Sequence, residues 1–377
     1  HGDFYDASWP LNRDGDDFLL RLEVRQYKIE MGVTKMKFLS TSAIALALLA
    51  NSASAEGKLV IYHWFEYMPA ELLEKFTAET GITVTMDTYD SNEAMLASLK
   101  AGGMGTYDVA VPGDYMVEIM AGEGLLDTIA DGELANKGNI SPEWADPSFD
   151  PGRTHSIPYQ WGSTSFSVNT EDYTGDINTT DILFNPPAEL SGKINVLDSQ
   201  GEVMALASLH MGFPQCDTDR AQLSALNDML QDAKTHWASF NSDTAKEVLV
   251  SGDVSVGMIY DGFSAKARAE RASITYAFPT QGYVVWMDNV VLLNDAPNRD
   301  SAIKFMDFML EPENIAAVSN YARYGLGVTG AGDFLDPDLA TLPESNPPET
   351  AGAGAFIAVC DEATQAVYDQ IWTNLKN

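Results

Sequence analysis

The stretch LVIYHWFEY, residues 59–67, decides which architecture we expect for this chain. It begins with an apolar run that predicts a buried strand, and Pro69 then opens a helical pattern that continues to Phe76. Aromatic residues and Glu66 therefore stand where a strand passes into a helix, which is where open α/β sheets bind ligands. A carboxylate beside aromatic faces suits a cation, although the aromatic residues could instead be core side chains next to a solvated Glu66.

The alternation of strand and helix continues from this stretch and predicts a parallel, doubly wound sheet. Residues 156–162, SIPYQWG, are interpreted as a crossing to a second α/β lobe, and residues 279–282 as the crossing back. Within the second lobe we expect a helix from Arg220 to Trp237. The predicted boundaries place lobe 1 in residues 56–157 and 283–332 and lobe 2 in residues 158–282 and 333–377.

The amino-terminal residues predict export. Residues 1–35 show no helical or strand period and are expected to be an upstream, non-structural segment. Residues 36–55 combine a basic start, a short apolar run and an A-x-A site, which are the parts of a secretory signal peptide cleaved after Ala55. The alternative is a retained anchor, but the apolar run is short for a bilayer. We therefore expect a periplasmic protein that is not inserted in the membrane.

The charge balance excludes some partners. The chain has 22 Lys and Arg against 55 Asp and Glu, a net charge of −33, which repels nucleic acid and anionic membrane surfaces and attracts cations. A dispersed acidic surface can also serve solubility or growth at high salt, so the charge alone does not locate a site. The two cysteines, Cys216 and Cys360, could form a disulfide in an oxidising compartment or remain free thiols.

Catalytic motifs are scarce in the sequence. It contains no HExxH, GxSxG or P-loop pattern, and its five His are dispersed. Residues 325–330, GLGVTG, match GxGxxG literally, but they follow a predicted helix rather than a strand and are expected to form a loop. We expect no catalytic residue, no metal ion and no cofactor.

Aromatic and acidic side chains recur instead at five predicted strand ends. They are Trp64, Glu66 and Tyr67; Asp114 and Tyr115; Asp198, Ser199 and Glu202; Tyr260 and Asp261; and Trp286 and Asp288. Each has a structural explanation alone, because an Asp after a strand commonly caps a helix and a Trp in a strand is usually core. Their recurrence favours one shared site for an elongated oligoamine, whose stem lies between aromatic faces while carboxylates bind its ammonium groups.

Several segments carry a resemblance to a known family. They are HWFEYMP (63–69), FTAETGITV (76–84), YDVAVPGDYMV (107–117), SIPYQWG (156–162), FNSD (240–243), GMIYDG (257–262) and WMDN (286–289). In these segments the chain resembles the periplasmic spermidine/putrescine-binding proteins of polyamine ABC importers. The resemblance implies a type II periplasmic binding protein fold, with two α/β lobes that close on a ligand in the cleft. It also implies a monomer that delivers a polyamine to a membrane permease.

The resemblance also implies a set of ligand contacts, with some departures. The implied contacts are Trp64, Glu66, Tyr67, Tyr115, Glu202, Trp286, Asp288 and Tyr324, with Tyr260 in place of the usual Trp. Gly113 stands where the family often has Ser, and Ser199 where spermidine-binding members have Asp. Asp114 and Asp261 are additional acids that could replace the missing carboxylate.

Two other functions remain open from the sequence. The same fold could bind another small cation, such as agmatine or a thiamine-like molecule. Alternatively, an exported enzyme could use paired carboxylates such as Glu66 and Asp288 for acid–base chemistry.

Overall fold

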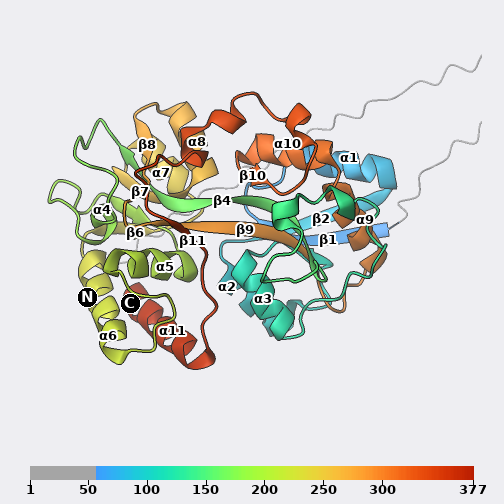
Figure 1. Cartoon of the computed structure of the whole chain (residues 1–377), viewed down its shortest axis with the longest axis horizontal. Helices are drawn as coiled ribbons and strands as arrows, with labels where there is room; N and C mark the ends of the chain where they lie inside the picture. The colour runs from blue at the N-terminus through green and yellow to red at the C-terminus, as the bar shows by residue number, and fades with distance from the viewer. Residues whose placement is uncertain (1–56) are drawn as a thin grey trace, which may run out of the picture. The chain divides into compact units, whose positions relative to one another are not determined.

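The structure is a computed structural model that describes residues 57–377 (Figure 1). The predicted upstream segment, the predicted signal peptide and the predicted cleavage after Ala55 lie outside the described residues.

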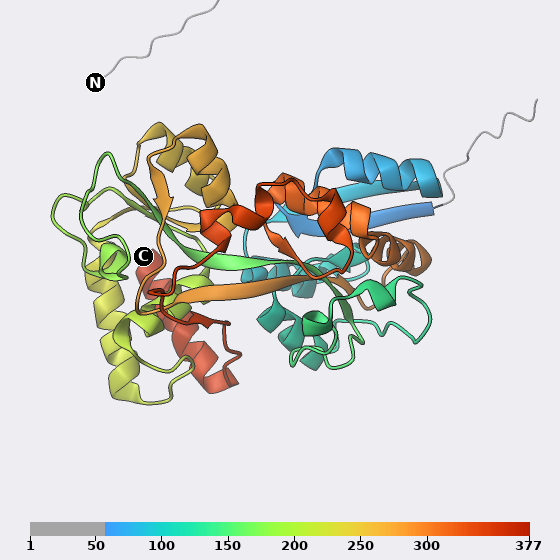
Figure 2. The same ribbon diagram turned by 45° about the horizontal axis from the view of Figure 1, so that its top comes forward.

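Two long strands connect two groups of elements within the described chain. β4 (Ser156–Asn169) and β9 (Tyr283–Leu292) pair antiparallel, with an irregular register between Pro158 and Trp161. Figure 2 shows both strands running between the two groups of helices. The segments interpreted from the sequence as crossings are therefore the start of β4 and the turn that leads into β9.

The first group, called the N-terminal lobe below, is built on parallel strands in the order β2-β1-β3. Gly81 ends its first helix in the left-handed conformation (φ 72°), as a C-terminal glycine does. The predicted alternation of strand and helix is confirmed here. Its elements are β1 (Gly57–Trp64), α1 (Ala70–Thr80), β2 (Ile82–Tyr89), α2 (Asn92–Ser98), η1 (Leu99–Gly103), β3 (Val109–Ala110), α3 (Asp114–Gly122), α9 (Arg299–Met309) and α10 (Pro312–Ala322).

The second group, the C-terminal lobe, has parallel strands in the order β7-β5-β6, with β4 antiparallel to β7 and β8. Its helices α5, α6 and α11 lie together on one side in Figure 1. Its elements are α4 (Asp181–Phe184), β5 (Ile194–Val196), α5 (Gln200–Met211), α6 (Arg220–Lys234), β6 (Trp237–Phe240), α7 (Ala245–Ser251), β7 (Val256–Tyr260), α8 (Asp261–Glu270), β8 (Ile274–Tyr276) and α11 (Glu362–Lys376).

The helix predicted to reach Trp237 is wrong at its carboxyl end. α6 ends at Lys234, and Trp237 begins the short strand β6, which pairs with β5 at the end of the sheet. Four half-exposed residues carry too little alternation to predict a strand, so the pairing with β5 decides the conformation.

The two lobes share one sheet. β9 pairs with β3 of the N-terminal lobe and with β4 along its length, and β4 pairs with β7 of the C-terminal lobe. Because the connecting strands are bonded to each other, the strand order β2-β1-β3-β9-β4-β7-β5-β6 is continuous. The residue boundaries expected for the lobes stay a prediction.

The carboxyl-terminal segment returns along both connecting strands. β10 (Gly325–Leu326), which begins the GxGxxG match, pairs with β4, so the expectation of a simple loop is wrong for these two residues. The short helix η4 (Ala331–Phe334) follows the match. β11 (Gly354–Ala355) then pairs with β9.

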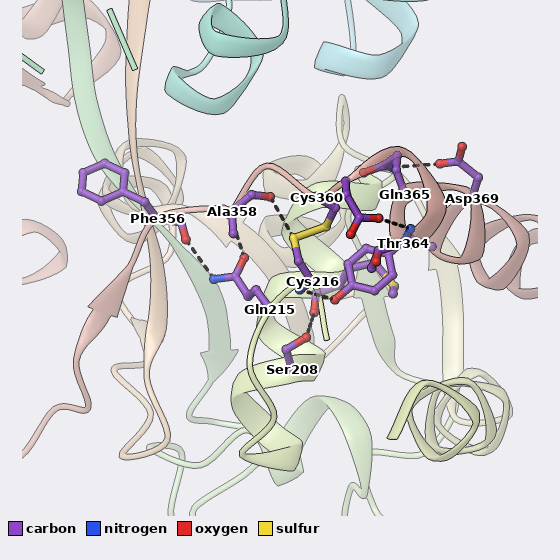
Figure 3. Close-up of a disulfide and its surroundings, with 12 residues drawn as sticks. Ser208, Gln215, Cys216, Phe356, Ala358, Cys360, Thr364, Gln365 and Asp369 are labelled. Atoms are coloured by element: carbon purple, nitrogen blue, oxygen red, sulfur yellow. Dashed lines mark hydrogen bonds between the residues drawn. A yellow bond between two sulfur atoms is a disulfide. The ribbon is translucent and has the colours of Figure 1, made fainter. Parts of the chain in front are cut away.

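A disulfide fixes this segment after β11. Cys216, in the loop between α5 and α6, is bonded to Cys360, with their Cα atoms 5.1 Å apart (Figure 3). Beside it, the Gln215 side chain donates to Phe356 O (2.9 Å) and accepts from Ala358 N (3.0 Å). These bonds hold the intervening Ile357 against the C-terminal lobe.

Replacement of both cysteines by serine is expected to lower the free energy of unfolding. The two cysteines are 144 residues apart, and the bond reduces the conformational entropy of the unfolded chain. For a loop of this length the loss of entropy raises the free energy of unfolding by roughly 4–5 kcal/mol at most. Urea unfolding of the variant and of the untreated and reduced wild type measures the effect. Equal midpoints for all three samples would contradict the prediction.

Candidate functional site

Strand ends from both lobes meet at one pocket. β1, β2 and β3 contribute from the N-terminal lobe, β5, β6 and β7 from the C-terminal lobe, and β9 lies between them. The pocket is partly open to solvent and is lined mainly by aromatic side chains with a few polar groups, as small-molecule sites are. Its lining is Trp64, Phe65, Tyr67, Tyr89, Asp90, Asn92, Gly113, Tyr115, Ser199, Glu202, Ser242, Asp243, Tyr260, Phe263, Trp286, Asp288, Tyr324 and Ile357.

Nine of the eighteen lining residues are aromatic, and the indole nitrogens of Trp64 and Trp286 are hydrogen-bonded to the fold. Trp286 packs against Tyr324 (centroids 5.1 Å apart) and Tyr260 (6.0 Å), both at steep angles. Trp286 Nε1 donates to Thr164 Oγ1 (3.0 Å), and Trp64 Nε1 donates to Val111 O (2.7 Å). Because these donors are occupied, the rings have fixed orientations and offer their faces to a ligand.

Two carboxylates of the lining are buried. Asp288, on β9, and Glu202, in the first turn of α5, are each 7% exposed. Burial raises the pKa of Glu202 to about 8, opposed by Thr164 and reinforced by the charge of Asp114. Burial also raises the pKa of Asp288, against the lowering effect of the Tyr67 hydroxyl.

Two buried polar atoms of the pocket lining have no hydrogen-bond partner in the described part of the chain. Within residues 57–377, neither Glu202 Oε2 nor the Tyr67 hydroxyl has a hydrogen-bond partner of normal geometry. The pocket lining, drawn from the same residues, includes no Lys, Arg or His. The site is therefore an acidic aromatic pocket whose lining, within the described chain, contains no basic side chain.

Two further acids lie at the exposed edge of this pocket, one from each lobe. Asp90 follows β2, and Asp243 follows β6; both side chains are exposed. Partial burial raises the pKa of Asp243, and the nearby charges of Asp90 and Asp198 raise it further. The two carboxylates therefore share this edge of the pocket, and their negative charges oppose each other.

Nine of the twelve residues expected to bind a ligand line the pocket. The residues brought together are Trp64, Tyr67, Tyr115, Ser199, Glu202, Tyr260, Trp286, Asp288 and Tyr324. Glu66, Asp114 and Asp261 are not part of the lining.

Asp114 and Asp261 are buried but bonded to the fold. Asp114 accepts from Tyr115 N (2.7 Å) and from Met287 N (2.7 Å), which ties α3 to β9. Asp261 accepts from Gly262 N (2.9 Å) and Ser163 Oγ (3.3 Å). Burial nevertheless raises the pKa of Asp114 to about 7 and that of Asp261 to about 8.

Glu66 lies at the surface beside other elements. It has φ 49° in the turn after β1, and its side chain is exposed. Burial lowers the pKa of Lys266 on α8 to about 8, and the charge of Glu66 opposes this. Glu66 is therefore an exposed acid outside the pocket lining, near enough to Lys266 for their charges to interact.

Nine lining residues were not among the expected contacts. They are Phe65, Tyr89, Asp90, Asn92, Gly113, Ser242, Asp243, Phe263 and Ile357. The strand-end rule applied to β2 would have found Tyr89 and Asp90. Ser242 and Asp243 follow β6, the strand that the sequence pattern did not predict.

Comparison with known proteins agrees with this geometry. Residues 71–365 match the family of bacterial extracellular solute-binding proteins, and the chain belongs to this family. The predicted type II periplasmic binding protein fold is confirmed.

Between residues 57 and 377 no helix is both long and apolar enough to cross a membrane. In the same part of the chain, no group of three or more His, Cys, Asp and Glu could hold a metal ion.

Individual relatives carry more specific names. The chain is 33% identical over 340 residues to the spermidine/putrescine-binding periplasmic protein of Escherichia coli, covering 90% of this chain and 97% of that protein. It is 30% identical over 353 residues to the putrescine/cadaverine-binding protein of Pseudomonas aeruginosa, covering 90% and 99%. A solved structure, the substrate-binding protein of a spermidine/putrescine ABC transporter from Streptococcus pneumoniae, superimposes with a TM-score of 0.69. It is 31% identical and covers 85% of this chain and 98% of that chain.

The raised pKa of Glu202 predicts a pH effect on the ligand-free protein. Between the ordinary pKa of 4.5 and about 8, the folded state retains a proton that the unfolded state releases, so stability falls as pH rises. Glu202→Gln should therefore stabilise the ligand-free protein at about pH 9 and have little effect at about pH 5. Thermal unfolding across this range, with Ser199→Ala as the control, tests it. A stability difference that does not change with pH would contradict it.

Proposed function

We propose that this protein is an exported receptor that captures a polyamine, putrescine or spermidine, and delivers it to the permease of an ABC importer. The observation that carries the proposal is the burial of Asp288 and Glu202 among aromatic rings with no basic residue in the pocket lining. A polyamine supplies the missing positive charge. The names of the relatives from Escherichia coli and Pseudomonas aeruginosa support the same ligand class.

One ammonium group binds in the buried part of the pocket. Asp288 and Glu202 accept its hydrogen bonds, and the Tyr67 hydroxyl of the same lining can accept another. Hydrogen bonds between charged groups are strong where water is excluded. Each aromatic face that the ammonium or its neighbouring methylene groups touch adds about 0.5–2 kcal/mol.

The second ammonium group lies toward Asp90 and Asp243. Ser199 leaves the start of α5 without the carboxylate that the resemblance implies there, and these two acids are the other carboxylates of the lining. Their mutual repulsion is relieved when a cation lies between them. Because one comes from each lobe, a ligand held in this way also favours closure of the lobes about β4 and β9.

The proposed setting follows from the same function. The receptor acts as a monomer in the periplasm after removal of the segment that ends at Ala55. It needs neither nucleic acid nor membrane insertion, and it releases its ligand chemically unchanged. Acid–base chemistry by Glu66 and Asp288 is disfavoured, because Glu66 is absent from the pocket lining.

Isothermal titration calorimetry of the full chain tests the ligand class. Putrescine and spermidine are expected to bind one-to-one with a Kd of roughly micromolar or below, since two charged groups and several aromatic faces contribute. Butane-1,4-diol, which has the same stem without charge, should give no heat. Binding of agmatine or thiamine with no response to either polyamine would assign the pocket to another cation.

Replacement of Asp288 by Asn is expected to weaken polyamine binding by about 2 kcal/mol or more, roughly thirtyfold in Kd, because it leaves a buried ammonium group without its charge partner. Asp131→Asn changes an exposed acid of the same type and serves as the control. The same titration measures both variants. Unchanged affinity in Asp288→Asn would remove this residue from the site.

A further inference from the structure

A second cavity lies between the lobes, next to the polyamine pocket. It has about 1280 Å³ of unoccupied space, part of it open to solvent. One wall comes from α2 and α3 of the N-terminal lobe, and the other from α5, α11 and the disulfide-bonded segment of the C-terminal lobe. Figure 3 shows the second wall, with Gln215, Ala358, Cys360, Gln365 and Asp369.

Glu93 is the unusual group in this cavity. Its Oε1 accepts a hydrogen bond from the Tyr115 hydroxyl (2.9 Å), whereas its Oε2 is buried and has no partner within residues 57–377. The Tyr115 hydroxyl also accepts from Asn92 Nδ2 (3.1 Å), so it is committed to this arrangement. A buried carboxylate oxygen without a partner is costly, and a cationic donor in the cavity would satisfy it.

The acids Glu93 and Asp369 of the cavity lining have no basic partner within residues 57–377. The basic residue of this lining, Lys100, is bonded to both oxygens of Glu123 (3.0 and 2.9 Å). On the opposite wall, Asp369 Oδ1 accepts from the amides of Gln200 (3.0 Å) and Gln365 (2.9 Å), which carry no charge. Burial raises the pKa of Glu93, the hydrogen bonds from its own backbone and from Tyr115 oppose this, and the charge of Asp369 on the other wall raises it as well.

A narrow contact separates the cavity from the polyamine pocket. Tyr115 and Ile357 line both spaces. Gly201 lies against them, since a Cβ at this position would be 3.1 Å from Tyr115 Oη and 3.3 Å from Ile357 Cδ1. Glu202, the next residue, points into the first pocket, and the charge of Glu93 also contributes to its raised pKa. Acidic side chains therefore lie on both sides of this contact, with Glu202 in the first pocket and Glu93 in the second cavity.

We propose that the second cavity binds a primary ammonium group at Glu93, opposite Asp369. This inference rests on the proposed polyamine function and adds a second subsite to it. The ammonium can belong to a second small amine, or to the far arm of a long polyamine that passes between Tyr115 and Ile357. The chemistry is the same in both cases, and titration with amines of different length distinguishes them.

The experiment is calorimetry of the full chain with putrescine and with spermine, in wild type and in Glu93→Gln. If a second molecule occupies the cavity, putrescine shows a second, weaker event in wild type. If a long arm does, spermine binds one-to-one and more tightly than putrescine. Glu93→Gln should weaken the second putrescine event, or the spermine affinity, by about tenfold or more, and leave the first putrescine event within about twofold of wild type.

Three further variants extend the test. Asp369→Asn should weaken the same binding event, and because its side chain is exposed this variant is expected to fold. It therefore tests the subsite independently if Glu93→Gln misfolds, which thermal unfolding would reveal. Glu118→Gln, an exposed acid on α3, is the matched control and should have no effect. Gly201→Ala crowds the contact and should weaken spermine more than putrescine only if an arm passes through it.

The outcomes separate the inference from the function on which it rests. A single putrescine event, together with spermine affinity that Glu93→Gln and Asp369→Asn leave unchanged, would overturn the second subsite and leave the polyamine pocket intact. Absence of any amine binding to wild type would overturn both.

Discussion

The burial of two carboxylates without a positive partner is the constraint on which the site depends. Removing an ionised carboxylate from water costs several kcal/mol, and Asp288 and Glu202 share one pocket. The fold offsets part of this cost locally. Glu202 occupies the first turn of α5, where the positive end of the helix favours a negative charge, and the Tyr67 hydroxyl favours the charged form of Asp288. The remainder is avoided in the ligand-free protein by protonation, as the raised pKa values of both acids show, and it is offset when a cation binds.

The position of these carboxylates follows from the shared sheet. Asp288 lies on β9, which is bonded to strands of both lobes, whereas Glu202 and Tyr260 belong to the C-terminal lobe and Trp64 and Tyr67 to the N-terminal lobe. Asp288 and Trp286 thus form a fixed floor, and each lobe brings one wall against it. A movement of the lobes about β4 and β9 changes the distances between the walls but leaves the floor intact.

The sequence was sufficient for the parts of this site that depend on local order. An apolar strand followed by aromatic and acidic residues identified Trp64, Tyr115 and Glu202, because the carboxyl ends of neighbouring parallel strands meet at one edge of the sheet. Asp288 was expected at a strand end but lies within β9, and it reaches the pocket because β9 passes between the two lobes. The rule could not tell whether an Asp after a strand faces the pocket or the backbone. Asp114 accepts a bond from the Met287 amide, which is distant in sequence and adjacent only in the folded sheet.

Asp243 was missed and Glu66 was misplaced by the sequence analysis for different physical reasons. Asp243 follows β6, whose strand conformation depends on pairing with β5 rather than on its own four residues. Glu66 lies in a turn with positive φ, and its side chain is exposed. Glu is not a residue type that favours positive φ, so the sequence does not predict this turn conformation. Local patterns therefore predicted the alternation of strands and helices and much of the buried half of the pocket, and the family resemblance added Tyr324. The exposed half depended on contacts between distant segments.

The two halves of the pocket differ in how they can select a ligand. Asp288 and Glu202 are buried, so their attraction for an ammonium group is little screened by salt. Asp90 and Asp243 are exposed, and their attraction for a second ammonium is weaker and sensitive to ionic strength. On the proposed function, the buried end fixes one amine in place while the exposed end tolerates stems of different length. Discrimination among polyamines then depends on whether a further arm finds a carboxylate, which makes the surroundings of Glu93 the decisive region.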